Sequence, residues 1–343
     1  MKGSVLKKFL CTCLVTAAAF AATTISASAC TTIYVGGDLV EEGTPFVART
    51  EDYGSDYNKL WFISESGKWK QGDHYVGCPE YGPFEWDFTH DSYRFTYFTN
   101  DIYYDGICPE CGEKADHYSY TEFGTNEKGV SVSATETLYG NEKVTEADPY
   151  RDAEWAEANK SERIGIEETD IPTIILAEAS SAREGVKLLL DIYENYGCVA
   201  ASGVFICDKD EVWYVENCSG TQYVAIKLND NVIFLEPNMA VIGRIDLDDE
   251  NVIASKDLIA VAKKAGTFVG DEAKNIIDFR ASYARISEKM DQRMIDGLNY
   301  LNAAYKYDSD ALVADNTKFT ISNLDASDKL VALYTNIKAD RKL

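Results

Sequence analysis

Alternating hydrophobic and polar positions predict short β-strands in two groups along the chain. The first group of alternating or β-branched runs covers residues 31–36, 45–49, 60–64 and 129–135. The second group covers residues 203–207, 212–216, 222–228 and 232–235, with polar turn residues at 208–210 and 229–231. Turns this short between strands predict antiparallel hairpins.

Helical periodicity separates and follows these groups. Residues 174–196 place Leu188, Leu189 and Ile192 on one face, and Gly197 follows as an end signal. Further helices are expected at 254–264, 272–294, 297–305 and 326–338, with a weak strand at 318–321. Residues 65–123 are rich in Gly, Tyr, Trp and Asp and predict loops and short strands. Strands, a helix, more strands and then helices indicate a layered α+β architecture.

The first 29 residues have the pattern of a secretory signal peptide. Three lysines precede the apolar run 9–22, and Ala27-Ser28-Ala29 forms an A-x-A cleavage site. The alternative is an anchor helix that stays uncut, which the short run and its small residues disfavour. We therefore expect a signal peptide at 1–29, a catalytic domain at 30–295 and a C-terminal tail at 296–343. The mature protein is expected to be secreted or held at the cell surface, without a transmembrane span.

The net charge limits the partners. The formal charge of the chain is −24, and removal of a leader with three lysines and no acid takes it to −27. A surface this acidic repels nucleic acid and anionic lipid, so neither is an expected partner. Solubility is the plainest reason for such a charge, and a homo-oligomer is compatible with it.

Cysteine use singles out one thiol. Two of the nine cysteines leave with the leader, and an odd number stays: Cys30, Cys78, Cys108, Cys111, Cys198, Cys207 and Cys218. At least one thiol of a monomer is then unpaired. Cys108-Pro109-Glu110-Cys111 resembles half of a zinc knuckle, which Cys78 and His74 or His117 could complete. A disulfide or two free loop thiols are the simpler readings of that pair, and we expect no cofactor.

The cleavage site lies directly before Cys30, so processing would place a free α-amine and a thiol on one residue. The amine titrates close to the range of the thiol and can accept its proton and later pass it to a leaving amine. Two other readings stay open at this point. Cys30 is either incidental at the cleavage site, or it is the acylated cysteine of a lipoprotein, although a lipobox has an aliphatic residue where Ala27 stands.

The chain resembles the C69-type dipeptidases, N-terminal-nucleophile hydrolases related to choloylglycine hydrolases and penicillin V acylases. The resemblance spans roughly residues 30–290. It rests on Cys-Thr-Thr-Ile-x-Val-Gly from position 30, on the segments 46–52, 124–130, 203–206 and 211–216, and on Pro237-Asn238 followed by 242–249. It implies a four-layer αββα sandwich with the cysteine at the end of a central strand.

The resemblance also implies site residues. Cys30 would be the nucleophile, Arg49 would lower the thiol pKa, and Asp52 would orient the α-amine. Asn126 and Asn238 match positions that help to hold the oxyanion in the related acylases. Each has a plainer reading: Arg49 and Asp52 as a surface ion pair, and the two asparagines as turn formers. Three late arginines are further candidates for the site: Arg244, Arg280 and Arg285.

Together these features predict a cysteine dipeptidase or amidohydrolase that cleaves small peptides through the N-terminal Cys30. An acylase of penicillin V or conjugated bile salts, or a non-catalytic lipoprotein acylated at Cys30, are the alternatives. The chain has neither a Gly-rich phosphate loop nor a Gly-x-Ser-x-Gly motif, so nucleotide binding and serine hydrolysis lack support.

Overall fold

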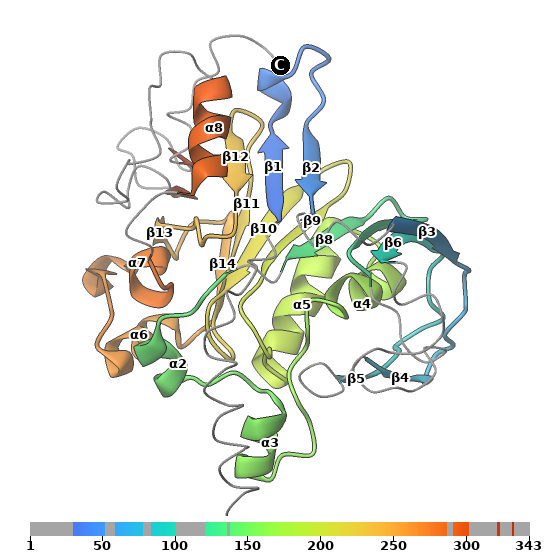
Figure 1. Ribbon diagram of the computed structural model, residues 1–343, viewed down its shortest axis with the longest axis horizontal. Helices are drawn as coiled ribbons and strands as arrows, with labels where there is room; N and C mark the ends of the chain where they lie inside the picture. The colour runs from blue at the N-terminus through green and yellow to red at the C-terminus, as the bar shows by residue number, and fades with distance from the viewer. Residues whose placement is uncertain are drawn as a thin grey trace, which may run out of the picture.

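The computed structural model describes residues 30–51, 59–77, 84–100, 121–135, 138–286 and 291–301, with two short strands at 321–322 and 331–332. Two antiparallel sheets form its centre, with helices on their outer sides (Figure 1). The larger sheet, which we call sheet B, has eight strands in the order β14-β11-β10-β9-β8-β7-β6-β3. Its bounds are Val252–Ala254, Tyr223–Lys227, Val212–Asn217, Gly203–Cys207, Ser131–Thr135, Phe123–Asn126, Phe95–Asn100 and Lys59–Ser64 in that order.

The smaller sheet, sheet A, carries the predicted nucleophile. Its central strand β1 (Thr31–Val35) pairs with β12 (Ile233–Glu236) on one side and with β2 (Phe46–Thr50) on the other. Small sheets flank the two large ones: β4 (His74–Val76) with β5 (Glu85–Asp87), β13 (Arg244–Asp246) with β16 (Ile276–Asp278) and β15 (Gly270–Asp271), and β17 (Ile321–Ser322) with β18 (Val331–Ala332).

Helices complete a four-layer arrangement. Helices α4 (Ile171–Glu178) and α5 (Ala182–Asn195) cover one face of sheet B, and α8 (Gln292–Leu301) contacts β12 of sheet A. The other helices are α2 (Glu142–Ala147), α3 (Ala153–Asn159), α6 (Leu258–Ala265) and α7 (Phe279–Tyr283), with 3-10 turns η1 (Gly37–Leu39) and η4 (Glu272–Lys274). Between the sheets, the ring of Phe234 lies 5.2 Å from that of Phe205 and 4.5 Å from that of Tyr214. This confirms the predicted α+β fold with two stacked sheets.

Most predicted strands are confirmed, but the turn at 229–231 is not a hairpin. Strand β11 before it pairs within sheet B, whereas β12 after it pairs with β1 in sheet A. The chain therefore crosses between the sheets here. Asp230 accepts a backbone hydrogen bond from Asp38, and its carbonyl lies so close to Gly36 that a Cβ there would overlap with it.

Two predicted helices are wrong in extent, and the helix expected at 326–338 is contradicted at residues 331–332, which form β18. The helix expected at 174–196 is broken into α4 and α5, because Ala179 leaves helical geometry and Ser181 caps the second helix. The helix expected at 272–294 is largely replaced by η4, β16 and α7. Asn275 adopts a left-handed backbone with φ of 55° and ends η4, which lets the next residues pair with β13.

Several predictions lie outside the described residues: the leader at 1–29, Asp52, the cysteines Cys78, Cys108 and Cys111, and His117. The expected domain boundary at residue 295 falls within α8, which packs on sheet A. Among the residues that the structure describes, no helix is both long and apolar enough to cross a bilayer.

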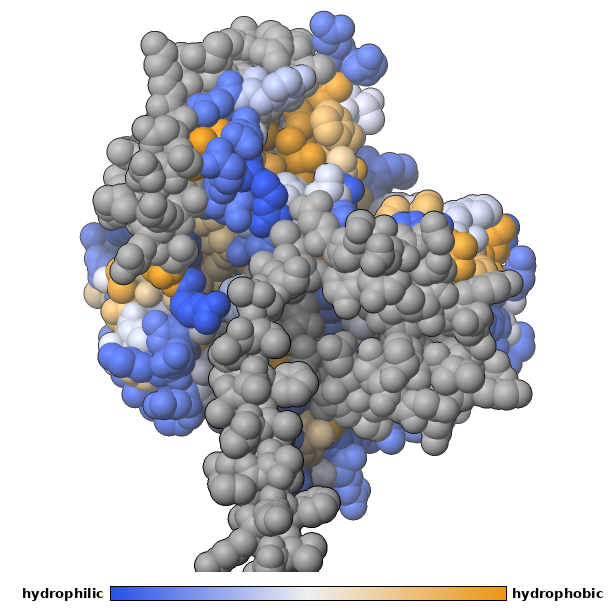
Figure 2. All heavy atoms as spheres, in the orientation of Figure 1, coloured by the Kyte–Doolittle hydropathy of each residue, from blue (hydrophilic) through white to orange (hydrophobic). Residues whose placement is uncertain are grey.

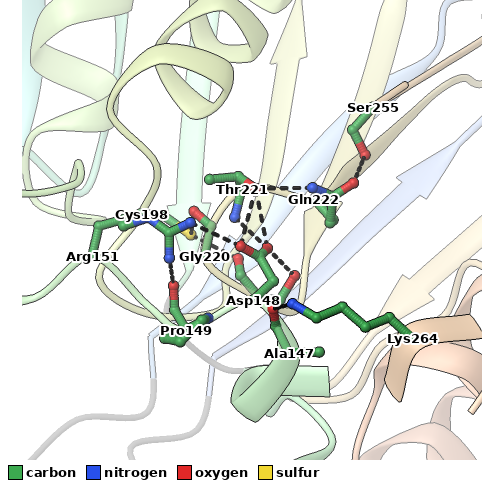
Figure 3. Close-up of polar contacts among 11 residues, drawn as sticks. Ala147, Asp148, Pro149, Arg151, Cys198, Gly220, Thr221, Gln222, Ser255 and Lys264 are labelled. Carbon is green, nitrogen blue, oxygen red and sulfur yellow. Dashed lines mark hydrogen bonds and ion pairs between the residues drawn. The ribbon is translucent and has the colours of Figure 1, made fainter. Parts of the chain in front are cut away.

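A buried carboxylate joins the helical segment 142–159 to sheet B (Figure 3). Asp148 is 5% exposed and accepts hydrogen bonds from the backbone of Thr221 at 2.8 Å and the hydroxyl of Ser219 at 2.9 Å. Arg151 donates to the same carboxylate at 2.9 Å. These bonds fix the turn that leads from β10 into β11.

Replacement of Asp148 by Asn should therefore lower the free energy of unfolding by about 2–4 kcal/mol, since it leaves Arg151 unpaired and places an amide donor against other donors. Urea denaturation measures this change. Asp210→Asn, at a carboxylate with 68% side-chain exposure, is the control and should change stability by less than about 0.5 kcal/mol. Equal effects in the two variants would contradict a structural role for Asp148.

Candidate active site

Cys30 lies at the end of the central strand of sheet A, with only 5% of its surface exposed. The strand register places Thr32 opposite Glu236 and Thr31 opposite Thr50. Continued by one residue, this register brings Cys30 near Asn238 on one side and near Glu51 on the other, and Arg293 bridges the Cys30 carbonyl and the Asn238 side chain. Since side chains alternate along a strand, Cys30 points to the same face as Thr32 and Tyr34, which is the face toward sheet B.

Arg49 contacts the sulfur of Cys30. It reaches across from β2, and its Nη2 donates to Sγ at 3.3 Å while its Nη1 donates to the carbonyl of Glu122 at 2.9 Å. The Arg49 side chain is 7% exposed, so its charge acts in an environment that water screens little. The structure thus brings together the first two predicted site residues.

Three carboxylates and one more cation surround Arg49. Glu168 lies 3.8 Å and Glu51 4.0 Å from its Nη2. Lys59 forms ion pairs with both Glu51 and Glu122, the latter at 2.5 Å. We call these five side chains (Arg49, Glu51, Lys59, Glu122 and Glu168) the charge cluster. Arg49 and Glu51 both lie in the segment 46–52, of which sequence reasoning gave a role only to Arg49. Lys59, Glu122 and Glu168 were missed because they come from three other segments of the chain and form no motif.

Opposing effects set the protonation of this region. Burial raises the pKa of the Cys30 thiol, and the charge and hydrogen bond of Arg49 counter only part of that effect. Burial tends to lower the pKa of Arg49, but Cys30 and Glu168 raise it overall. Burial and the hydrogen bond with Glu51 raise the pKa of Glu122. A thiol in this state needs a base to take its proton at neutral pH.

Arg293 holds Cys30 from the other side. Its Nη1 donates to the Cys30 carbonyl at 2.9 Å and to the Thr31 hydroxyl at 3.0 Å, and its Nη2 donates to Oδ1 of Asn238 at 2.7 Å. Asp291 pairs with the same guanidinium at 3.0 Å. Arg293 is 263 positions from Cys30 and lies in no recognised motif, so it could not be found from sequence patterns.

Asn238 lies beside Cys30 with a left-handed backbone, at φ of 54°. Asparagine tolerates this region better than most residues, and non-glycine residues held there concentrate at functional sites. The turn that carries it is tied to sheet B, because Glu216 accepts hydrogen bonds from the backbone of Val241 at 2.7 Å and Ile242 at 3.1 Å.

The structure does not bring Asn126 to the sulfur. Asn126 ends β7, four residues from Glu122 and thus about 13 Å along an extended strand. Its amide donates to the carbonyls of Leu176 at 3.0 Å and Ala179 at 2.8 Å, and its Oδ1 accepts from the backbone of Val130. Here Asn126 shapes a turn and anchors α4, which was the plainer reading of that residue.

The three arginines considered from the sequence lie elsewhere. Arg244 is exposed on β13, and Arg280 is buried in α7. Arg285 lies 4.3 Å over the ring of Tyr139. The contacts found for these three do not include Cys30, and Arg293 takes the place that we expected one of them to fill.

A cleft of about 610 Å³ runs beside Arg49 between β2 and sheet B. Its walls are mainly apolar, with small hydroxyl and thiol groups among them: Phe46, Val47, Ala48, Phe123, Thr125, Ser131, Val132, Ser133, Phe205 and Cys207. Burial raises the pKa of the Cys207 thiol to about 11. The cleft has room for a hydrophobic side chain beside Arg49.

Sheet A does not cover the far end of sheet B. Trp61, Phe98 and Phe123 form one row across β3, β6 and β7 on the face that packs against sheet A at Phe205. Trp61 is 55% and Phe123 40% exposed. Figure 2 shows apolar side chains beside β1 and β2 and again over β3. The cleft is therefore open on this side in the described structure.

Metal ligands do not converge in the described part of the chain, where no group of three His, Cys, Asp or Glu residues could hold an ion. Of the residues that a zinc knuckle could have used, only His74 is described, and it contacts Asp87 at 2.7 Å. The four described cysteines carry free thiols: Cys30, Cys198, Cys207 and Cys218. Burial also raises the pKa of Cys218.

Known proteins match this chain over most of its length. Residues 29–310 match the model of peptidase family C69. A protein named probable dipeptidase B from Streptococcus pyogenes serotype M6 is 33% identical over 72% of this chain and 44% of its own length. A probable dipeptidase from Salmonella dublin is 32% identical over 75% of this chain and 53% of its own length. The chain thus spans about half the length of these relatives.

Among solved structures, penicillin V acylase from Agrobacterium tumefaciens matches with a TM-score of 0.35 and 15% identity. The match covers 61% of this chain and 49% of the acylase.

Replacement of Arg49 by Gln should slow the alkylation of Cys30 by iodoacetamide about tenfold or more at about pH 7.5, since the thiol loses the cation that favours its thiolate. Mass spectrometry of the peptide that contains Cys30 measures the rate. Arg94→Gln is the control, because Arg94 is an exposed arginine whose ion pair is with the exposed Glu65. Unchanged alkylation in the Arg49 variant would show that its charge does not act on the thiol.

Glu216 should make stability depend on pH. Burial raises the pKa of Glu216 from its ordinary value of 4.5 to about 7. Between pH 4.5 and about pH 7, the folded protein therefore keeps a proton on Glu216 that the unfolded chain has lost. The free energy of unfolding should therefore fall by up to about 3 kcal/mol as the pH rises from about 4.5 to about 7. Urea denaturation across this range should give a flatter slope for Glu216→Gln than for the unmodified chain. Parallel slopes would contradict this titration, whatever the absolute stabilities.

Proposed function

The chain belongs to peptidase family C69, and from this membership and the surroundings of Cys30 we propose that it is a cysteine dipeptidase activated by removal of the leader before Cys30. The observation that carries the proposal is the 3.3 Å contact between the Arg49 guanidinium and the Cys30 sulfur at the start of a central strand. The names of the relatives, which concern dipeptidases, support the choice of substrate.

The reaction begins with the α-amine that cleavage creates on Cys30. This amine takes the thiol proton, and the sulfur attacks the carbonyl carbon of the scissile bond. When the carbon–nitrogen bond breaks, the leaving amine takes the proton from the α-ammonium and a thioester remains on Cys30. Water then attacks the thioester with the amine again as base, which releases the acid product and restores the thiol.

The residues around the sulfur have separate roles in this scheme. Arg49 favours the thiolate by its charge. Arg293 fixes the Cys30 carbonyl and, by binding Oδ1 of Asn238, sets the orientation of that amide. Asn238 is then the side chain that we expect to donate to the oxyanion. Export through the leader would place the enzyme outside the cell or at its surface.

Replacement of Cys30 by Ser or Ala should reduce dipeptide hydrolysis at least about a thousandfold, because the attacking sulfur is lost. Release of free amino acids from a set of dipeptides measures activity. Thermal unfolding serves as the control for folding. Cys198→Ala supplies the matched thiol variant. The Cys198 sulfur donates a hydrogen bond to the Ser219 carbonyl at 3.1 Å and does not line the cleft. Activity that survives in the Cys30 variants would refute the mechanism.

The N-terminus of the exported protein tests whether the leader is removed directly before Cys30. N-terminal sequencing should begin at Cys30, and the mass of the N-terminal peptide should match a free α-amine on that residue. A diacylglyceryl adduct on Cys30 would identify a lipoprotein instead. Hydrolysis of penicillin V or conjugated bile salts in preference to dipeptides would identify an acylase.

A further inference from the structure

The floor of the cleft beside Arg49 is a regular grid of side chains on three neighbouring strands. Cross-strand pairing sets Ser133 of β8 opposite Phe123 of β7 on one side and opposite Phe205 of β9 on the other. All three residues line the cleft. Side chains that lie directly opposite each other in a sheet have Cβ atoms about 5 Å apart. One small hydroxyl side chain therefore lies between two phenylalanines, and we call these three residues the slot.

Both phenylalanine rings of the slot are held by aromatic neighbours of their own. The ring of Phe123 stacks on that of Phe98 at 4.5 Å, with 11° between the two planes. The ring of Phe205 lies 4.8 Å from that of Tyr214 and 5.2 Å from that of Phe234. Strands β7 and β9 are two strand spacings apart, which is about 9–10 Å. Since packed aromatic rings prefer centroid distances of about 4.5–7 Å, the slot has the width of one further ring.

The hydroxyl of Ser133 is buried and has no hydrogen-bond partner. The next row of the grid differs in this respect. The hydroxyls of Thr125 and Ser131 lie 2.7 Å apart and bond to each other, and the Cys207 thiol bonds with Ser131. A buried hydroxyl without a partner is unfavourable, and most buried polar groups in proteins have one. Because Ser133 lines a cleft, a bound ligand can supply the partner that the protein does not.

The slot lies next to the end of the cleft that holds the sulfur. The carbonyl of Glu122 accepts hydrogen bonds from Nη1 of Arg49 at 2.9 Å and from the backbone of Ala134 at 3.5 Å. Ser133 is thus the neighbour of the residue that meets Arg49 through this carbonyl, and Arg49 contacts the sulfur of Cys30. The side chain of a substrate residue begins about 2.5 Å from the carbonyl carbon of that residue. The residue whose carbonyl is attacked is therefore the one whose side chain can enter the slot.

We propose that the slot binds a tyrosine ring of the substrate residue whose carbonyl Cys30 attacks, and that Ser133 determines this specificity by bonding the phenolic hydroxyl. The inference rests on the proposed function and names the side chain that the site selects. A tyrosine ring packs between Phe123 and Phe205 and brings Ser133 a hydroxyl that can donate or accept. A phenylalanine ring fills the same space but covers the serine hydroxyl and leaves it unpaired, which disfavours that substrate.

The test compares the hydrolysis of tyrosylglycine and phenylalanylglycine by the exported protein. The unmodified enzyme should have a kcat/KM about tenfold higher for tyrosylglycine. Ser133→Ala removes the hydroxyl and keeps the slot open, so it should lower kcat/KM for tyrosylglycine about tenfold and change that for phenylalanylglycine less than about threefold. Ser66→Ala, at an exposed serine on the turn after β3, is the matched control and should change neither value.

Binding distinguishes a failure of this inference from a failure of the proposed function. Calorimetry with the Cys30→Ala protein measures the affinity for both dipeptides without turnover, and adding Ser133→Ala should abolish the preference for tyrosylglycine. If this preference and its loss are observed while the unmodified enzyme hydrolyses neither dipeptide, the proposed function fails and the slot stands. Equal kcat/KM values for the two dipeptides in the unmodified enzyme, or a preference that survives Ser133→Ala, would overturn the role of Ser133 and leave the peptidase intact.

Discussion

The site depends on a guanidinium placed against a buried sulfur. Burial alone raises the thiol pKa, and Arg49 is the cation that works in the other direction. A buried arginine is itself unstable without acceptors, and the carbonyl of Glu122 and the carboxylate of Glu168 supply them. The acidic cluster is therefore a structural requirement for holding Arg49 against the sulfur of Cys30.

The two sheets explain how residues far apart in sequence reach one sulfur. Sheet A sets Cys30 between β2 and β12, so Arg49 and Asn238 arrive by strand pairing. Glu122 comes from the start of β7 in sheet B and Glu168 from the loop before α4, so they arrive by the packing of layers. Arg293 comes last, through the docking of α8 on β12. Each layer contributes different residues to the site. The geometry around Cys30 therefore forms only when the layers are packed on one another correctly.

Sequence reasoning recovered what the local pattern of residues encodes. Alternation predicted β1, β8, β9 and β10, and the position of Cys30 singled out the thiol that Arg49 contacts. It failed where pairing between distant segments decides the structure. The turn at 229–231 crosses between the two sheets. In the segment 272–294, residues 276–278 pair with β13 although their pattern predicts a helix. Arg293 and Glu168 were missed for the same reason, because only tertiary packing places them near the sulfur. Asn126 is the opposite case. A motif match made it a candidate donor to the oxyanion, but in the structure its side chain accepts from the backbone of Val130 and shapes a turn.

The raised thiol pKa values have a consequence for thiol–disulfide exchange between the cysteines. Thiol–disulfide exchange needs a thiolate to attack, and Cys207 and Cys218 are held protonated by burial at neutral pH. Cys207 lines the cleft, but as a protonated thiol it is a poor nucleophile for disulfide exchange at the sulfur of Cys30. The same burial favours the protonated form of the Cys30 thiol. A protein arranged in this way can carry several free cysteines side by side without the sulfur of Cys30 being lost to a disulfide with its neighbours.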